Sequence, residues 1–112
     1  MNNTSIKPIL ADFAAKVKPL VGNKLDAVIL FGSYARDDFE EGSDVDVMVL
    51  VNMPPEQLLS LRKPILDIAF DLGWDNGFLI STVIESAEIF NRYKEASGFF
   101  SNVAAEGVRI SV

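Results

Sequence analysis

The chain has 112 residues, 49% of them hydrophobic, so residues 1–112 are expected to form a single compact domain with its own core. Its formal net charge of −6 argues against direct binding of nucleic acid, because contacts to a phosphate backbone need Lys and Arg side chains. With no Cys and no His, the chain excludes disulfides, imidazole bases and imidazole ligands, which leaves carboxylate oxygens that suit Mg²⁺ better than zinc.

The first half of the chain predicts one helix and two strands. Residues 1–5 are polar and no long apolar stretch follows, so neither a signal peptide nor a membrane span is expected, and the absence of cysteine fits a reducing cytoplasm. Apolar residues at helical spacing indicate an amphipathic helix over residues 6–21. The apolar run at 27–31 predicts a buried strand, followed by a turn and a short helix over 34–38. Residues 44–51 predict a second strand that is apolar on both faces, as in a central strand covered from both sides.

The second half predicts more helices and one further strand. A helix is expected over residues 56–72, kinked or divided by Pro64 and capped by Gly73. The next strand is expected over 78–84. Two shorter helices should follow, over residues 86–93 and 98–106, before an apolar tail at 108–112. Helices that alternate with strands predict an α/β domain, with a small mixed β-sheet of three or more strands flanked by helices, whose order this pattern does not fix.

A Gly-Ser turn follows the first predicted strand. Gly32 lets a ligand approach the backbone closely, and free N–H groups in such a turn can bind phosphate oxygens. The hydroxyl of Ser33 can add one more donor. The alternative is an ordinary strand-to-helix turn with Ser33 as the N-cap, which is the commoner situation for Gly-Ser alone.

Two aspartates stand at the start of the second predicted strand. Asp44 and Asp46 are two residues apart, so on a strand they point to the same face. Like charges about 4 Å apart repel by roughly 4 kcal/mol at an effective dielectric constant of 20. A bound Mg²⁺ would remove that conflict and bring its own triphosphate. In the alternative, Asp44 caps the loop and Asp46 faces solvent.

The two features together resemble the signature of the DNA polymerase β-like nucleotidyltransferase superfamily: Gly32-Ser33, ten residues, then Asp44-Val45-Asp46. The small size resembles the minimal nucleotidyltransferases, which are antitoxin partners of HEPN-domain toxins. The resemblance implies a nucleotidyltransferase fold in which Gly32 and Ser33 bind the triphosphate and Asp44 and Asp46 are catalytic Mg²⁺ ligands. The implied reaction is in-line attack on the α-phosphorus of ATP, with AMP passing to a hydroxyl of the toxin and pyrophosphate leaving.

Arg36 is a further candidate for nucleotide binding, because its planar donor fork suits phosphate. The alternative is a surface ion pair with Asp37, Asp38 or Glu40. Members of the family commonly carry Gly after this Arg, whereas this chain has Asp37.

A third carboxylate, usual on a later strand in active relatives, is missing from the expected strand at 78–84. That acid is the usual candidate for the general base. Glu85 follows the strand as a replacement candidate or as a solvated residue, and Asp75 precedes it in an expected turn. The binding of one Mg-ATP is therefore expected, while the transfer step is in question.

Three functions compete on these residues. The first is a protein adenylyltransferase acting as antitoxin within a hetero-oligomer. The second is a degenerate fold that neutralises its partner by contact alone, and the third, a small-molecule transferase of the aminoglycoside-modifying kind, would need a longer chain. The acidic surface near the site favours a basic partner. Tyr34 is expected to pack rather than to stack on a base, and most phenylalanines are expected in the core, namely Phe13, Phe31, Phe70, Phe78, Phe90, Phe99 and Phe100.

Overall fold

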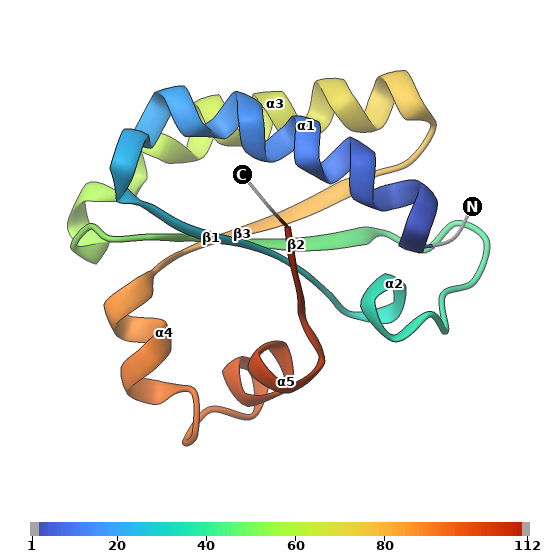
Figure 1. Ribbon diagram of the computed structural model, residues 1–112. Helices are drawn as coiled ribbons and strands as arrows, with labels where there is room; N and C mark the ends of the chain where they lie inside the picture. Colours follow the sequence, from blue (N-terminus) through green and yellow to red (C-terminus); the bar gives the residue numbers. More distant parts are fainter. Residues whose placement is uncertain (1–2, 111–112) are drawn as a thin grey trace.

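The computed structural model describes residues 3–110, with side chains from residue 5 onward. A four-stranded sheet carries helices α1 and α3 on one face and helices α4 and α5 on the other (Figure 1). The elements are, in chain order, α1 (Asn3–Val21), a 3₁₀ turn (Gly22–Lys24), β1 (Leu25–Phe31), α2 (Ser33–Arg36), β2 (Val45–Val51), a 3₁₀ turn (Pro55–Gln57), α3 (Leu59–Asn76), β3 (Ile80–Ser86), α4 (Ala87–Tyr93), α5 (Gly98–Glu106) and β4 (Val108–Ile110). None of the helices in the described range is both long and apolar enough to cross a membrane.

The sheet is mixed, as the sequence predicts. Its strand order is β3-β2-β1-β4, with β2 parallel to β3 and β1 antiparallel to both β2 and β4. Strand β4 falls within the expected apolar tail, whose last residues, 111–112, lie outside the described residues. A three-residue strand has too few positions to show the alternation that would distinguish it from a tail.

Strand β2 is covered on both faces, which explains its unbroken apolar sequence. Val45, Val47 and Val49 pack into the cluster formed by α1 and α3. Met48 and Leu50 point the other way, into a smaller cluster that includes Phe90 of α4 and Val103 of α5. Burying each such side chain stabilises the fold by about 1.5–3 kcal/mol, so the central strand is held firmly from both sides.

Helix α3 differs from its prediction at both ends. It begins at Leu59, runs unbroken through Pro64 and ends at Asn76. The next residue, Gly77, is the C-cap, with φ 81° and an N–H that donates to the Gly73 carbonyl. Gly73 lies buried inside the helix, where an added Cβ would come within 2.4 Å of the Phe78 carbonyl oxygen. The prediction that Gly73 caps this helix is therefore wrong, because this glycine allows a close chain approach instead.

The longer α3 moves the residues that follow it. Asp75 lies on the last turn of the helix rather than in a turn, and β3 begins two residues later than predicted. The predictions of core positions for Phe70 and Phe99 are wrong, because both rings are exposed. In α1, by contrast, the predicted stripe is buried apart from the half-buried Ile9 and the exposed Leu20, and its four buried members are Ile6, Leu10, Phe13 and Val17.

Candidate active site

The Gly-Ser turn and the aspartates meet at one edge of the sheet. Because β1 and β2 are antiparallel, the end of β1 lies beside the start of β2, and Phe31 pairs with Asp46. Strand β2 begins at Val45, so Asp44 belongs to the loop before it rather than to the strand as predicted. The side chain of Asp44 is exposed, whereas that of Asp46 is half-buried.

Gly32 is in direct contact with Asp46. It has φ 73° and ψ −154°, and a Cβ added there would lie 2.4 Å from Oδ2 of Asp46. This backbone conformation is almost confined to glycine, and the contact leaves no room for a side chain. The backbone conformation and the nearby Asp46 carboxylate together require glycine at this position. The close approach of a ligand to this turn stays a prediction.

Gly32, not Ser33, is the N-cap of α2, so the alternative role considered for Ser33 does not hold. The Gly32 carbonyl accepts hydrogen bonds from the backbone N–H groups of Ala35 and Arg36. Within residues 3–110 the Ser33 hydroxyl makes no hydrogen bond. The first N–H groups of a helix also have no partner inside it, so the start of α2 presents donors next to Asp46.

The pKa of the Asp46 carboxyl is raised above its ordinary value. Burial is the largest cause, and the negative charge of Asp44 is the second, while Arg36 lowers the pKa. The coupling places the two carboxylates close enough to repel each other. A cation beside the pair would relieve both causes of the shift.

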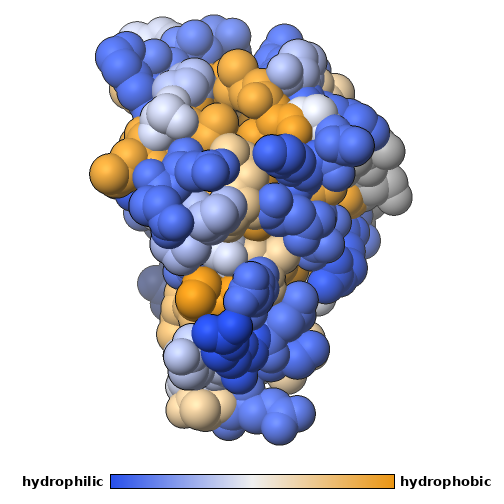
Figure 2. All heavy atoms as spheres, turned by 90° about the vertical axis from the view of Figure 1, so that its left-hand side faces the viewer, coloured by the Kyte–Doolittle hydropathy of each residue, from blue (hydrophilic) through white to orange (hydrophobic). Residues whose placement is uncertain are grey.

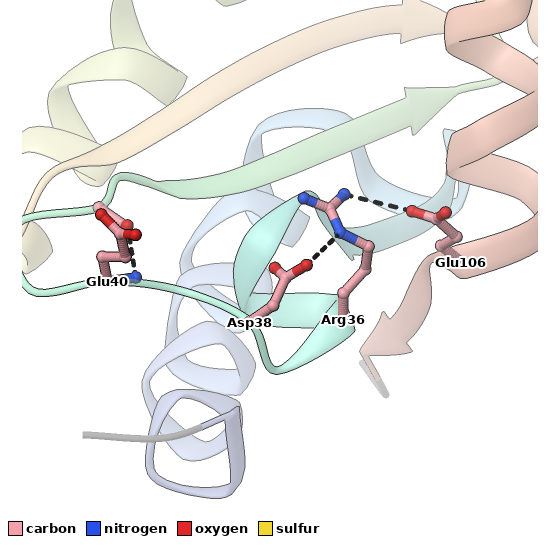
Figure 3. A network of polar contacts seen from close by, with 5 residues as sticks. Arg36, Asp38, Glu40 and Glu106 are labelled. Atoms are coloured by element: carbon pink, nitrogen blue, oxygen red, sulfur yellow. Dashed lines mark hydrogen bonds and ion pairs between the residues drawn. The ribbon is translucent and has the colours of Figure 1, made fainter.

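Arg36 forms an ion-pair network between two helices (Figure 3). Its Nε donates to Asp38 at 3.0 Å, and its Nη1 donates to Glu106 of α5 at 3.3 Å. The surface ion pair with Asp38 was one of the sequence-level alternatives, but Glu106 is 70 residues away and sequence spacing gave no sign of it. A contact between Arg36 and phosphate stays a prediction.

Asp37 takes the left-handed conformation that glycine favours. It is the C-cap of α2 with φ 63°, and it is the one non-glycine residue with positive φ among residues 3–110. Aspartate tolerates this region better than most side chains. The loop therefore keeps the backbone shape that a glycine after Arg36 would give it, with an added negative charge.

The loop between α2 and β2 is held in place by backbone and side-chain bonds. The N–H of Glu40 donates to the Ser43 hydroxyl at 2.9 Å, and the N–H of Ser43 donates to the Glu40 carbonyl at 3.0 Å (Figure 3). The N–H of Val45 then donates to the Leu79 carbonyl at 2.8 Å. These bonds position Asp44 next to the segment that leads into β3.

The parallel pairing of β2 and β3 places Ser81 beside Asp46. Glu85 pairs with Leu50, four residues farther along, which is about 13 Å at 3.3 Å per residue. Its carboxylate accepts a hydrogen bond from the N–H of Ser86 instead. The register therefore rules Glu85 out as the third acid, and no group of three Asp, Glu, His or Cys side chains within residues 3–110 lies close enough to hold a metal ion.

Tyr34 packs against Phe39, in agreement with the expected packing role. It is buried, and its ring stacks on Phe39 with centroids 4.1 Å apart. The pair forms one wall of a pocket of about 660 Å³, which could not be predicted from the sequence. Residues 40–44 line the pocket on one side and residues 77–79 on the other, so it opens directly beside Asp44.

Known proteins are similar to this chain in sequence and in fold. The family model described as nucleotidyltransferase domain matches residues 10–100. Two proteins of Methanocaldococcus jannaschii named "Putative protein adenylyltransferase" are similar: MJ0141 is 36% identical over 102 residues (91% of this chain, 95% of that protein), and MJ0604 is 31% identical over 98 residues (88% and 90%). A solved "toxin-antitoxin with AMP-PNP" shares the fold, with a TM-score of 0.52 and 20% identity over 88% of this chain and 70% of that one. This chain therefore belongs to the nucleotidyltransferase domain family, as a domain of the minimal type.

Proposed function

We propose that this chain transfers AMP from ATP to a hydroxyl of a partner protein, a HEPN-type toxin, and so acts as its antitoxin. The observation that carries the proposal is the contact between Gly32 and Asp46, which joins a phosphate-binding turn to an acidic pair. The names of the two Methanocaldococcus relatives support protein adenylylation. The toxin–antitoxin neighbour with AMP-PNP supports ATP as the nucleotide and a toxin as the partner.

Mg²⁺ fits the donors at this edge of the sheet. Asp44 and Asp46 offer hard carboxylate oxygens, and a cation between them would offset the burial and repulsion that raise the pKa of Asp46. Two carboxylates suffice for one ion that keeps water and phosphate oxygens as its other ligands. When bound, Mg²⁺ would neutralise phosphate charge and orient the triphosphate.

The chain's own residues would bind and orient the nucleotide. Gly32 lets phosphate oxygens approach the backbone, and the Ser33 hydroxyl is available as a donor. In the transfer, a bond forms between the acceptor oxygen and the α-phosphorus while the bond to pyrophosphate breaks, and the hydroxyl proton needs a base. Ser81, the residue beside Asp46, is not a base near neutral pH, so we expect slower transfer than with a carboxylate at position 81.

The same serine favours a second candidate function. With Ser81 beside Asp46, no third acidic side chain within residues 3–110 joins the pair, although the family resemblance implies one. A chain that binds Mg-ATP without transferring AMP would still occupy a toxin surface. It would then act as a contact-only antitoxin.

One experiment distinguishes the two functions. The chain is incubated with labelled ATP, Mg²⁺ and the protein encoded beside it, and the partner's mass is measured. If the chain adenylylates its partner, the partner becomes labelled and heavier by AMP. Asp44→Asn should abolish this labelling. Asp26→Asn should leave it unchanged, because Asp26 is an exposed residue at the far end of β1. A stable complex with no label, formed equally by Asp44→Asn, supports the contact-only function, and the absence of both label and complex rejects both.

A further inference from the structure

The end of α3 exposes a group of large hydrophobic side chains, here named the aromatic patch. Phe70 is 58% exposed and Trp74 is 78% exposed, and their rings stack with centroids 6.1 Å apart. The patch extends beyond the helix to Phe78 and Leu79. Phe78 lines a shallow pocket together with Trp74, and Leu79 is 53% exposed. Grouped aromatic side chains on a surface are typical of a protein interaction site.

Acidic side chains flank the aromatic patch without neutralising partners. Asp71 and Asp75 line a pocket of about 320 Å³ together with Phe70 and Trp74. Neither aspartate forms an ion pair within residues 3–110. The sequence from residue 64 to residue 91 contains no Lys or Arg. An aromatic face between two carboxylates is the setting in which a guanidinium or ammonium group binds favourably.

The aromatic patch continues into the candidate active site. Phe78 and Leu79 line the 660 Å³ pocket whose opposite side is the acidic loop ending at Asp44. The bond from the Val45 N–H to the Leu79 carbonyl ties the patch to the start of β2. A protein bound over Trp74 would therefore reach the edge of the sheet where AMP transfer is proposed.

Unlike the aromatic patch, a second exposed hydrophobic region adjoins basic residues in the sequence. It includes Leu59, which is 75% exposed at the other end of α3. Figure 2 views that end of the molecule, where hydrophobic patches in the upper part are interrupted by hydrophilic side chains. Basic residues are present in the adjoining sequence, with Arg62 and Lys63 on the same helix. Leu59 therefore serves as a matched control.

We propose that the partner protein docks on the aromatic patch through a basic segment, with an Arg or Lys side chain lying over Trp74 between Asp71 and Asp75. The identity of this partner as the AMP acceptor rests on the proposed function. The docking itself rests on the exposed rings, the unpaired aspartates and the absence of Lys and Arg from residues 64–91.

Trp74 is the only tryptophan of the chain, so its emission reports directly on the patch. The probes are an amphipathic helical peptide with Leu and Arg on one face and the same peptide with Gln in place of Arg. We expect the Arg peptide to shift Trp74 emission and to bind about tenfold tighter than the Gln peptide, the factor that 1.4 kcal/mol of cation–π and charge interaction gives. Equal affinity of the two peptides would overturn the proposal.

Matched charge variants make the test specific. Asp71→Lys with Asp75→Lys should abolish the preference for Arg, whereas Asp26→Lys with Glu95→Lys, at exposed residues without ion pairs, should keep it. Binding that the first pair leaves intact would contradict the proposed site. Without peptide, the Trp74 emission should not depend on the concentration of the protein. If it does, and sedimentation shows dimers, the patch binds a second copy of this chain and the basic partner is rejected.

The link to AMP transfer has its own measurement. With the protein encoded beside this chain as partner, Trp74→Ala should prevent the complex and any transfer, while leaving Mg-ATP binding by calorimetry unchanged. Leu59→Ala should change neither. Failure of Mg-ATP binding in the parent would reject the proposed function and leave the peptide result standing, whereas normal complex formation by Trp74→Ala would reject the docking site alone.

Discussion

The contact between Gly32 and Asp46 predicts a large and specific effect of Gly32→Ala. Alanine at position 32 would have to adopt a backbone conformation that costs about 1–3 kcal/mol for residues other than glycine. It would also lie 2.4 Å from Oδ2 of Asp46, so the carboxylate must rotate away at a further cost of about 1 kcal/mol. We expect Gly32→Ala to lower the free energy of unfolding by about 2–4 kcal/mol, and Mg-ATP binding to be lost.

Gly42→Ala is the control for the backbone part of this effect. Gly42 also has a positive φ, 87°, but a Cβ added to it would meet no atom within 4 Å, so only the conformational cost of about 1–2 kcal/mol applies. Urea denaturation measures both variants, and calorimetry with Mg-ATP measures binding. A double-mutant cycle with Asp46→Ala isolates the contact, because the double variant should lose less stability than the sum of the two single ones. Equal losses for Gly32→Ala and Gly42→Ala, with an additive cycle, would refute the contact.

Three further predictions concern the acidic pair and its neighbour. Mg-ATP should raise the melting temperature, because a ligand selective for the folded state stabilises it by mass action. ATP with EDTA should raise the melting temperature much less. If millimolar ATP causes no Mg-dependent shift, the site is contradicted. Since the folded-state pKa of Asp46 is raised, its contribution to stability is full at low pH and is lost as pH rises through that pKa. In EDTA, Asp46→Asn should therefore be more stable than the parent at pH 7, and denaturation curves should show this difference shrinking towards pH 4. Ser81→Asp, which places a carboxylate beside Asp46, should increase the rate of AMP transfer measured with labelled ATP, whereas the uncharged Ser81→Asn should not.

The sequence predicted those features that depend on local pattern. The apolar run of β2, the strand before Gly32 and the mixed α/β sheet all follow from periodicity and glycine placement, and the structure confirms them. The meeting of Gly32 and Asp46 depends on the pairing of only two strands, which are consecutive in the chain.

The features that the sequence did not predict depend on register and on distant contacts. Glu85 could be placed relative to Asp46 only once β2 and β3 were paired, since a shift of a few residues carries a side chain many ångströms along a strand. The partner of Arg36, Glu106, comes from a helix far along the chain. Gly73 looked like a helix end because glycine often is one, but here the close approach of the Phe78 carbonyl determined its role.

The position of β1 has a consequence for how the protein is made. Strand β1 lies inside the sheet, yet its partner β4 is synthesised after all the other described elements. During translation one side of β1 thus keeps unpaired backbone groups until residues 108–110 emerge from the ribosome. Glu106, which anchors Arg36 of α2, emerges just before them. The nascent chain therefore completes the surroundings of the Gly32-Ser33 turn only after α5 and β4 have been made, and a ribosome stalled before residue 106 would hold a domain with an open sheet edge and an unanchored α2.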